Sequence, residues 1–573
     1  MTVMRDNSTL LHRLYLWYLD QPNAEAQLYK DENQNWQPIR VKQYWFNVVR
    51  IARWITSRGL GPGDRLALYA LNSPEWVQWE LGTWLAGCAS VSVHPNTSEL
   101  DLQRILDQTQ PKLILVQSEL FKEKVAADRE YFGNALTFAE ANRAMLEETP
   151  SDEALLNAQG EALLRQVNPE APQAIVYTSG STGIPKGVSL GLRQFTFVAD
   201  ALNREWNLPF ADGSLFSFLP LSHVAEKIQA IAVGISQRYP VWFNSKYDRF
   251  LQELKEVRPV MFLAVPRVWE RMKEQIENHR PKLLRRVMEF ERLGPWAEKI
   301  YLSQVKEQLG LDQLALAVAG AAKLPPSVGE WFRSIGIEIQ EIYGMSECTG
   351  LATLTSSPRK RFDGVGTPPL GVEVKLSPEG EVWVRGPHVF FGYDQDPEET
   401  KKILLEDGWL KTGDLGEWTH SGTQEEELRI IGRNREIIKL SNGRMVAPLP
   451  IENALKEIAE VSNACVVGEG HSQVLALITL NEKILMEHKF IPGSIEGMLV
   501  EDEALKKRIA EGIATLSHQK KIGERLNKFV ILSREFSVDQ GEVTSTQKLN
   551  RNQIQKNFKY FIELAYELSD SEI

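Results

Sequence analysis

The sequence predicts an α/β fold: a large N-terminal domain of mixed sheets layered with helices, and a small α+β C-terminal domain. At 573 residues the chain is too long for one hydrophobic core. Helix and strand patterns alternate between residues 42 and 116, which is typical of largely parallel sheets covered by helices. The charged segment 428–440 then separates a β-rich region from a new run of helix and strand patterns. We therefore predict domains at 1–433 and 434–573.

The first part of the chain is interpreted as scaffold, because its residues suggest packing and turns rather than chemistry. Apolar residues at helix spacing predict a helix over 42–60. Ser73 followed by Pro74 is typical of an N-cap and the first position of a second helix. The neighbouring expectations are a turn at 61–64, strands at 65–69, 89–93 and 112–116, and a helix at 100–108.

Composition excludes several classes of protein. The formal net charge of −11 argues against a nucleic-acid binder with a broad basic surface. Three widely spaced cysteines favour neither a disulfide framework nor a zinc site, and they fit a reducing cytosol. No signal-peptide pattern and no apolar run of roughly 18 residues is found, so we expect a cytoplasmic protein. The basic amphipathic segment 279–299 favours a solvated helix and leaves peripheral contact with the inner membrane face open.

A loop rich in glycine and hydroxyl groups follows the apolar strand 174–177. Glycines let backbone N–H groups close on an anion, hydroxyls can reach a metal, and a lysine adds positive charge. The loop does not fit the Walker A register, because Pro185 precedes the lysine and Gly187 follows it. A polyphosphate site and a Ser/Gly-rich surface turn are both open here. The residues concerned are Thr178, Ser179, Gly180, Ser181, Thr182, Gly183 and Lys186.

Several later residues have weak signals when each is taken alone. Tyr343 at a strand end can stack on a base, and Glu347 can bind magnesium, although a strand-to-loop turn explains both. Asp414 between glycines suits two ribose hydroxyls, but a turn aspartate is the ordinary interpretation. His223 follows Ser222, the expected N-cap of a helix, and fits a core histidine, a proton shuttle or a pocket wall. Gly320, Ala321 and Ala322 would let backbone approach a flat or bulky group, and Lys548 alone would pass for a surface lysine.

Taken together, these pieces resemble the adenylate-forming superfamily of acyl-CoA synthetases, beetle-type luciferases and peptide-synthetase adenylation domains. The resemblance covers nearly the whole chain, and its motifs occur in the family's order at 178–187, 343–347, 413–414, 432–436 and 548. The segments 219–226, 265–270 and 544–549 look most like long-chain acyl-CoA synthetases. The departures are Ser346 and Ser181, where threonine is common, and Arg435-Glu436, where Lys-Asp is usual.

The resemblance implies an AMP-forming acyl-CoA ligase that uses ATP, Mg²⁺ and coenzyme A on a fatty acid. In the first half-reaction the loop from Thr178 to Lys186 would hold the β- and γ-phosphates. Thr178 and Glu347 would hold magnesium, and Lys548 would sit between the carboxylate and the α-phosphate. Adenine would stack on Tyr343 beside Gly320–Ala322, with Gly344 and Ser346 in the same nucleotide motif.

In the second half-reaction the resemblance implies a mobile C-terminal lid that turns about Arg435 and Glu436. Asp414 and Arg433 would contact the ribose, and Lys439 would line the channel where the thioester forms. His223, Gly234 and Val318 are expected in the acyl pocket.

Three alternatives are kept beside this function. An acyl-AMP ligase could load a separate carrier protein, a non-catalytic nucleotide-binding paralogue could act as a scaffold, and a luciferase-type oxygenase would emit light. The presence of Glu347 and Lys548 disfavours the non-catalytic paralogue. Chain-length preference and oligomeric state are not indicated by the sequence.

Overall fold

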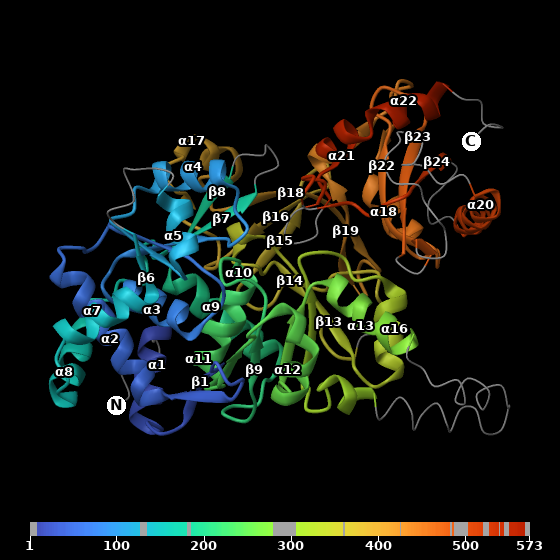
Figure 1. Ribbon diagram of the computed structural model, residues 1–573. Coiled ribbons are helices and arrows are strands. Elements are labelled where there is room, and N and C mark those ends of the chain that lie inside the picture. Colours follow the sequence, from blue (N-terminus) through green and yellow to red (C-terminus); the bar gives the residue numbers. More distant parts are fainter. Residues whose placement is uncertain are drawn as a thin grey trace, which may run out of the picture.

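The computed structural model describes residues 9–126, 135–179, 185–278, 305–358, 361–423, 426–481, 484–485, 502–519, 526–537, 539–543 and 549–567. Across these residues the chain forms two large sheets with helices between and outside them, a smaller antiparallel sheet, and a separate C-terminal unit (Figure 1). The fold therefore agrees with the predicted α/β class.

A seven-stranded sheet contains the first predicted strands. β3, β4, β5, β6 and β7 pair in parallel, whereas β8 and β17 pair antiparallel at one edge. The predicted strands at 65–69, 89–93 and 112–116 are confirmed, the last beginning one residue later. In spatial order the strands are β17 (Gly392–Tyr393), β8 (Pro185–Leu190), β7 (Ala174–Ser179), β4 (Ala89–Val93), β3 (Arg65–Tyr69), β5 (Leu113–Val116) and β6 (Ala135–Thr137).

An eight-stranded sheet forms the second large layer. Its central strands β10, β9, β11, β12 and β13 are parallel, so their carboxyl ends share one edge. In spatial order the strands are β14 (Thr353–Leu354), β13 (Ile339–Tyr343), β12 (Leu316–Gly320), β11 (Met261–Ala264), β9 (Leu215–Ser217), β10 (Val241–Phe243), β1 (Glu25–Lys30) and β2 (Trp36–Arg40).

Helices pack on both faces of these sheets because alternate strand residues point to opposite faces. One core lies between the sheets and the helices α1 (Leu10–Asp20), α2 (Val41–Ser57), α3 (Pro74–Leu85) and α9 (Leu192–Trp206). On the outer faces lie α4 (Glu99–Thr109), α5 (Glu119–Ala126), α12 (Phe250–Val257), α13 (Pro266–Asn278) and α16 (Pro326–Ser334). The helices α7 (Phe138–Glu148) and α8 (Glu153–Leu164) pack against α2.

Ser73 is confirmed as the N-cap of α3, because its side chain accepts a hydrogen bond from the Trp76 amide and Pro74 follows it. The expected Ser222 cap is wrong. His223 occupies that position before the short helix α10 (Val224–Glu226), and its Nδ1 accepts from the Ala225 amide at 3.3 Å. An imidazole nitrogen can accept from a backbone N–H as a serine hydroxyl does, so the histidine replaces the cap.

α10 continues into a π-helix, η1 (Lys227–Val233), and then α11 (Gly234–Gln237). The π-helix is held by buried polar groups. The Lys227 ammonium forms an ion pair with the Glu80 carboxylate, and both side chains are fully buried. The Gln229 side-chain amide donates to the Phe216 carbonyl on β9 and accepts from the Leu263 backbone amide on β11. Gln229 thereby links β9 and β11, which are paired at only one described position, Leu215 opposite Met261.

The smaller sheet is antiparallel and lies between the large part and the C-terminal unit (Figure 1). Its strands are β15 (Glu373–Leu376), β16 (Glu381–Arg385), β18 (Leu410–Thr419) and β19 (Glu427–Arg433). The helix α17 (Pro397–Ile403) precedes β18.

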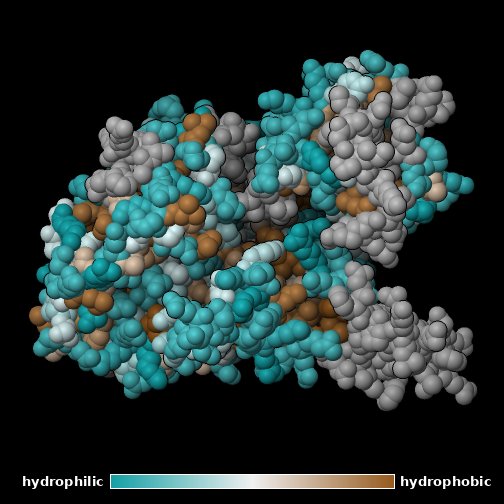
Figure 2. Space-filling view, viewed as in Figure 1, coloured by the Kyte–Doolittle hydropathy of each residue, from teal (hydrophilic) through white to brown (hydrophobic). Residues whose placement is uncertain are grey.

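The C-terminal unit has its own cores on both faces of a three-stranded sheet. The three-stranded sheet consists of β22 (Val461–Val467), β23 (Val474–Leu480) and β24 (Leu526–Leu532), and a separate two-stranded sheet consists of β20 (Ile438–Lys439) and β21 (Met445–Val446). The described helices of this unit are α18 (Pro448–Leu455), α20 (Glu503–His518), α21 (Arg551–Asn557) and α22 (Lys559–Glu567). The space-filling view shows a mostly hydrophilic surface, hollowed between this unit and the rest, with hydrophobic residues beside the hollow (Figure 2). The boundary at 433/434 stays a prediction.

Within the part of the chain that the structure describes, no helix is both long and apolar enough to span a bilayer. The three cysteines are free and buried. The basic segment 279–299 lies outside the described residues, so the expectation of a solvated helix or a membrane contact there stays a prediction.

Candidate active site

The loop predicted to bind phosphate is the tip of the hairpin formed by β7 and β8. The strands pair antiparallel, with Thr178 opposite Lys186. Gly180, Ser181, Thr182 and Gly183 lie outside the described residues, as does the side chain of Ser179. The described part of the hairpin thus places the predicted metal-binding hydroxyl and the predicted phosphate-binding lysine beside each other at the base of the loop.

Lys186 has an anionic partner in this structure. Its Nζ lies 2.6 Å from Oε2 of Glu399 on α17, and it lies 5.1 Å from the centre of the Tyr393 ring. Hydrogen bonds from Lys186 and then Lys402 lower the pKa of Glu399 to about 2. Glu399 is therefore ionised at any physiological pH.

Glu347, the predicted magnesium ligand, is buried in a short 3₁₀ turn, η3 (Ser346–Cys348), just after β13. Its backbone carbonyl accepts from the Phe390 amide at 2.8 Å, and its Oε1 accepts from the Tyr393 hydroxyl at 2.6 Å. Burial, and then the charge of Glu347, raises the pKa of Tyr393 well above its ordinary value. Tyr393 therefore stays a hydrogen-bond donor, and its ring and hydroxyl link Lys186 to Glu347.

The predicted nucleoside residues meet in a second cluster. The Tyr343 hydroxyl donates to Oδ2 of Asp414 at 2.8 Å, and Nε of Arg433 lies 3.2 Å from Oδ1 of Asp414. Asp414 on β18 pairs with Arg433 on β19 in the antiparallel ladder, so the sheet itself places carboxylate and guanidinium opposite each other. Burial, with a smaller effect of Asp414, raises the pKa of Tyr343 well above its ordinary value.

Backbone shape also fits a ligand beside Tyr343. Gly320 at the end of β12 pairs with Ile342 on β13, so Gly320–Ala322 lie next to Tyr343. Ala321 has a φ of 67°, a left-handed conformation that costs free energy in a residue with a β-carbon and that clusters at ligand sites. A β-carbon on Gly344 would lie 2.4 Å from the Gly350 carbonyl carbon, so this position requires glycine. Ser346 is buried in the same turn.

The residues predicted for the acyl pocket are only partly brought together. A β-carbon on Gly350 would lie 3.2 Å from Cδ1 of Ile228, so the start of the π-helix after His223 lies against Gly350, three residues after Glu347. Val318 is fully buried on β12, in the core that also contains Ile228. Gly234 instead packs over Leu215 and Val241, on β9 and β10, which are separated from β12 by β11. The structure therefore does not place Gly234 beside Val318.

The predicted hinge lies in a short 3₁₀ turn, η4 (Asn434–Glu436), which contains Arg435 and Glu436. Glu436 lies 3.6 Å from the guanidinium of Arg551, which also binds the buried Glu452 carboxylate at 2.6 Å. Lys439 ends β20 and is exposed. Lys548 lies outside the described residues, and its neighbour Leu549 pairs with Val543 in an isolated β-bridge.

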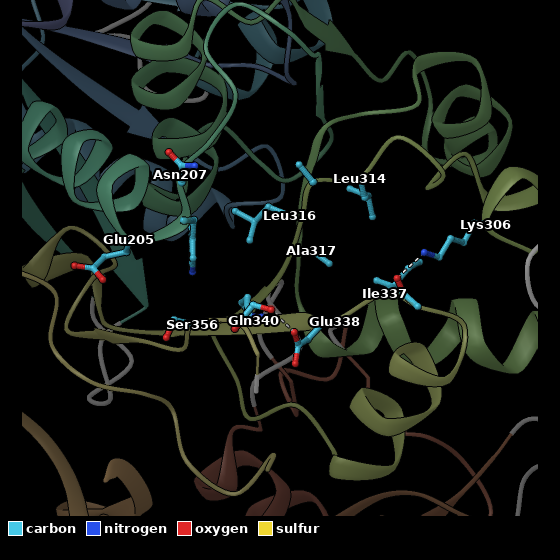
Figure 3. Close-up of a pocket in the computed structure, with 14 residues that line it drawn as sticks. Glu205, Asn207, Lys306, Leu314, Leu316, Ala317, Ile337, Glu338, Gln340 and Ser356 are labelled. Atoms are coloured by element: carbon cyan, nitrogen blue, oxygen red, sulfur yellow. Dashed lines mark hydrogen bonds between the residues drawn. The ribbon is translucent and has the colours of Figure 1, made fainter. Parts of the chain in front are cut away.

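A surface crevice of about 360 Å³ lies at the other end of the sheet (Figure 3). It opens at the amino ends of β12 and β13, whereas Gly320 and Tyr343 lie at their carboxyl ends. Ligands in open α/β sheets bind outside the carboxyl ends of strands. No predicted site residue lines the crevice, so we do not assign it to the reaction. Its walls are formed in part by Glu205, Trp206, Lys306, Leu316, Ile337, Glu338 and Gln340.

Sequence reasoning missed Tyr393 and Glu399. Neither belongs to a recognisable phosphate or metal motif, and both lie more than 200 residues after Lys186 in the chain. Pairing of the two-residue strand β17 with β8 brings them to the hairpin, with Tyr393 opposite Val188. Long-range pairing of so short a strand leaves little trace in a single sequence.

The fold is that of adenylate-forming enzymes. The structure of o-succinylbenzoate CoA synthetase from Bacillus subtilis in complex with its acyl-adenylate intermediate matches with a TM-score of 0.70 and 20% identity, covering 95% of this chain and 97% of that one. ATP-bound MatB from Rhodopseudomonas palustris matches with a TM-score of 0.71 and 22% identity, covering 97% of this chain and 99% of that one. At these identities the likeness shows the fold.

The chain belongs to the AMP-binding enzyme family. Residues 18–394 match the AMP-binding enzyme model, and residues 435–570 match the AMP-binding enzyme C-terminal domain. The chain is similar to the long-chain-fatty-acid–CoA ligase ACSBG2 of Rattus norvegicus, with 28% identity over 95% of this chain and 91% of that protein. The chain is also similar to the long-chain-fatty-acid–CoA ligase ACSBG2 of Homo sapiens, with 26% identity over 93% of this chain and 89% of that protein.

Proposed function

We propose that the protein is an AMP-forming fatty acid–CoA ligase, which activates a long-chain fatty acid with ATP and transfers the acyl group to coenzyme A. Family membership and similarity to long-chain-fatty-acid–CoA ligases along nearly the whole chain support this function. The observation that carries it is the contact of Tyr343, Asp414 and Arg433 in one cluster, with Glu347 four residues beyond Tyr343.

In the first half-reaction the fatty acid carboxylate attacks the α-phosphate of ATP and pyrophosphate leaves. Two anions must approach, so the site has to neutralise charge as the new bond forms. We assign Lys186 and the loop before it to the β- and γ-phosphates, and Lys548 to the reacting carboxylate and α-phosphate. The Asp414 carboxylate would accept hydrogen bonds from the ribose hydroxyls, and the Tyr343 ring would pack against adenine.

Magnesium fits the residues at this site. Among the described residues no group of three or more His, Cys, Asp or Glu side chains that could hold a metal ion occurs. Mg²⁺ is usually held by one or two carboxylates together with substrate phosphates, which suits the buried Glu347 carboxylate and the Thr178 hydroxyl. When bound there, the ion would supply positive charge that offsets the negative charge of the substrate phosphates.

In the second half-reaction the thiol of coenzyme A attacks the acyl-adenylate carbonyl and AMP leaves. We propose that residues 434–573 act as a lid that turns about Arg435 and Glu436, withdrawing Lys548 and presenting Lys439 to the thioester channel. A lysine on a flexible stem suits a charge that must arrive and then leave. The acyl chain would lie beside Val318 and the start of the π-helix after His223, with Gly234 further along the same face of the sheet.

The test is pyrophosphate release and thioester formation across fatty acids of graded length, with and without coenzyme A. We expect release with long-chain acids and a thioester product when coenzyme A is present. Acid-dependent release without any thioester would favour an acyl-AMP ligase for a separate carrier protein. Preference for acetate or an aromatic acid would contradict the long-chain assignment, and no release with any acid would favour a non-catalytic nucleotide binder.

A further inference from the structure

Among the described residues, the anion that contacts Lys186 is Glu399, and the proposed reaction gives Glu399 no role. Lys186 Nζ lies 2.6 Å from Oε2 of Glu399, at the base of the loop predicted to bind the β- and γ-phosphates. The pair is partly shielded from water, since the side chains of Lys186 and Glu399 are 18% and 26% exposed. The Glu399 carboxylate thus binds the Lys186 ammonium, to which a phosphate oxygen of ATP would be expected to bind.

From this contact we infer that Glu399 is a resting partner of Lys186, displaced by the polyphosphate of ATP. Glu399 would be a positioning residue for nucleotide entry: it keeps the lysine folded toward α17 until phosphate oxygens compete for it. The inference rests on the proposed function, because it takes ATP as the ligand and the β7–β8 loop as its phosphate site.

The backbone that carries Glu399 is held in place, so we expect the long lysine side chain to move when the ion pair opens. The Glu399 amide donates to Oδ1 of Asp396 at 3.0 Å, which caps α17. The Tyr393 amide donates to Oγ1 of Thr400 at 2.8 Å, and β17 pairs with β8. Helix α17 is therefore bound to the same hairpin that supplies Lys186.

Release of Lys186 does not leave Glu399 unpaired. Lys402, one turn further along α17, also forms a salt bridge with the Glu399 carboxylate. Lys186, on a flexible stem, can exchange one anion for another at modest cost, because a partly exposed ion pair contributes little net free energy. The exchange would take place beside the magnesium site, since Lys186 lies over the ring of Tyr393 and the hydroxyl of Tyr393 binds Glu347.

The experiment compares binding of MgATP and of AMP to the full chain, by calorimetry, for wild type and Glu399→Gln. AMP is the internal control because it lacks the β- and γ-phosphates. We expect Glu399→Gln to bind MgATP roughly twofold to fivefold more tightly, the range that loss of a partly exposed ion pair allows. AMP affinity should stay unchanged, which also shows that the variant is folded.

Glu398→Gln is the matched control. Glu398 is the adjacent residue on α17, its side chain is 78% exposed, and it pairs with Lys401 rather than Lys186. The same loss of charge there should leave both affinities unchanged. In a Lys186→Gln background, the gain from Glu399→Gln should fall below about twofold, because the displaced contact no longer exists.

Unchanged or weaker MgATP binding by Glu399→Gln would overturn the inference, as would an equal gain for AMP, an equal gain in Glu398→Gln, or a gain that persists without Lys186. These results differ from failure of the proposed function, in which wild type itself binds neither MgATP nor AMP.

Discussion

Asp414 is held between two partners that would orient it toward a ribose. The Tyr343 hydroxyl binds Oδ2 and the Arg433 guanidinium lies beside Oδ1, so the carboxylate plane is set before any ligand enters. A positioned acceptor loses little rotational freedom on binding, which favours a nucleoside that offers two vicinal hydroxyls. A turn aspartate without such partners would not have this property.

We therefore predict that Asp414→Asn weakens AMP binding roughly tenfold to a hundredfold, since a hydrogen bond to a charged acceptor contributes about 1.5–3 kcal/mol. Calorimetric titration with AMP measures the change. The matched control is Glu417→Gln on the same strand, because Glu417 faces Arg429 across the same ladder and its side chain is 46% exposed. Equal losses in both variants would contradict a ribose contact at Asp414.

Lys548 is assigned by resemblance alone, since it lies outside the described residues. We expect Lys548→Ala to slow acyl-AMP formation about a hundredfold or more, because it removes a charge that offsets the developing negative charge of the transition state. Single-turnover pyrophosphate release measures this step. Thioester formation from added acyl-AMP should change little. Near-normal pyrophosphate release would remove Lys548 from the adenylation step, and Lys559→Ala on the exposed surface of α22 serves as the control.

At the scale of single elements, the segment α10–η1 is unusual because consecutive ionisable residues are both fully buried. Lys227 is paired with Glu80. Neither carboxyl oxygen of Glu226 has a hydrogen-bond partner among the described residues, although Ser217 and Leu219 lie near enough to lower its pKa. Burial outweighs them and raises the pKa of Glu226 to about 8. Glu226 is therefore a neutral acid at pH 7.

This pKa has a consequence for stability. The unfolded chain ionises Glu226 from near pH 4.5, whereas the folded protein keeps its proton until about pH 8. The unfolded state thus binds fewer protons between these values, and Glu226 lowers the free energy of unfolding as pH rises, by roughly 1.4 kcal/mol per unit. Glutamine at this position does not titrate.

We predict that Glu226→Gln gains stability relative to wild type as pH rises from 5 to 8, with no further gain above about pH 8. Denaturant midpoints at several pH values, followed by a fluorescence probe of the N-terminal part, measure the difference. Glu75→Gln, outside this buried cluster, is the control. A difference that does not vary with pH would show that Glu226 is ionised in the folded protein or that its pKa is ordinary.

At the scale of the whole molecule, the large N-terminal part and the C-terminal unit are joined near residue 434. The turn η4 joins β19 to β20, and the Glu436–Arg551 ion pair ties this turn to the start of α21, three residues after Lys548. Arg267 of α13 also donates to the Ser462 hydroxyl at 3.3 Å across the two parts. A change of backbone angle at 434–436 would therefore be expected to move the Lys548 segment with the C-terminal unit.

Restricting this turn should separate the two half-reactions. We expect Arg435→Pro to keep acyl-AMP formation within a few-fold of wild type and to slow thioester formation roughly tenfold or more, because proline fixes φ in the proposed hinge. Arg435→Gly removes the same side chain but leaves the backbone free, so both steps should persist. Rapid-quench measurement of acyl-AMP and thioester tests this, and equal slowing of both steps in Arg435→Pro would contradict a hinge role.

Much of the architecture could be read from local patterns. The apolar spacing over 42–60 predicted α2, and Ser73-Pro74 predicted the start of α3, because helix periodicity and capping depend on residues close together in the chain. The candidate nucleotide residues Tyr343 and Asp414 gave only weak signals one by one, and they were predicted together because the spaced motifs resemble those of a known family. Local patterns failed at Ser222, where His223 forms the cap instead, and at the π-helix, which sequence periodicity does not distinguish from an α-helix.

The sequence by itself determined the α/β class, the order of the elements, and the set of glycines, hydroxyls, acids and lysines that the reaction would need. Only the tertiary structure decided which of them touch. Tyr343 at the end of β13 meets Asp414 on β18, a strand of a different sheet, and Lys186 meets Glu399 because β17 pairs with β8. These contacts join residues 71 and 213 positions apart. Such pairings depend on how sheets pack and which edge strand is covered, and these are properties of the whole chain rather than of any segment.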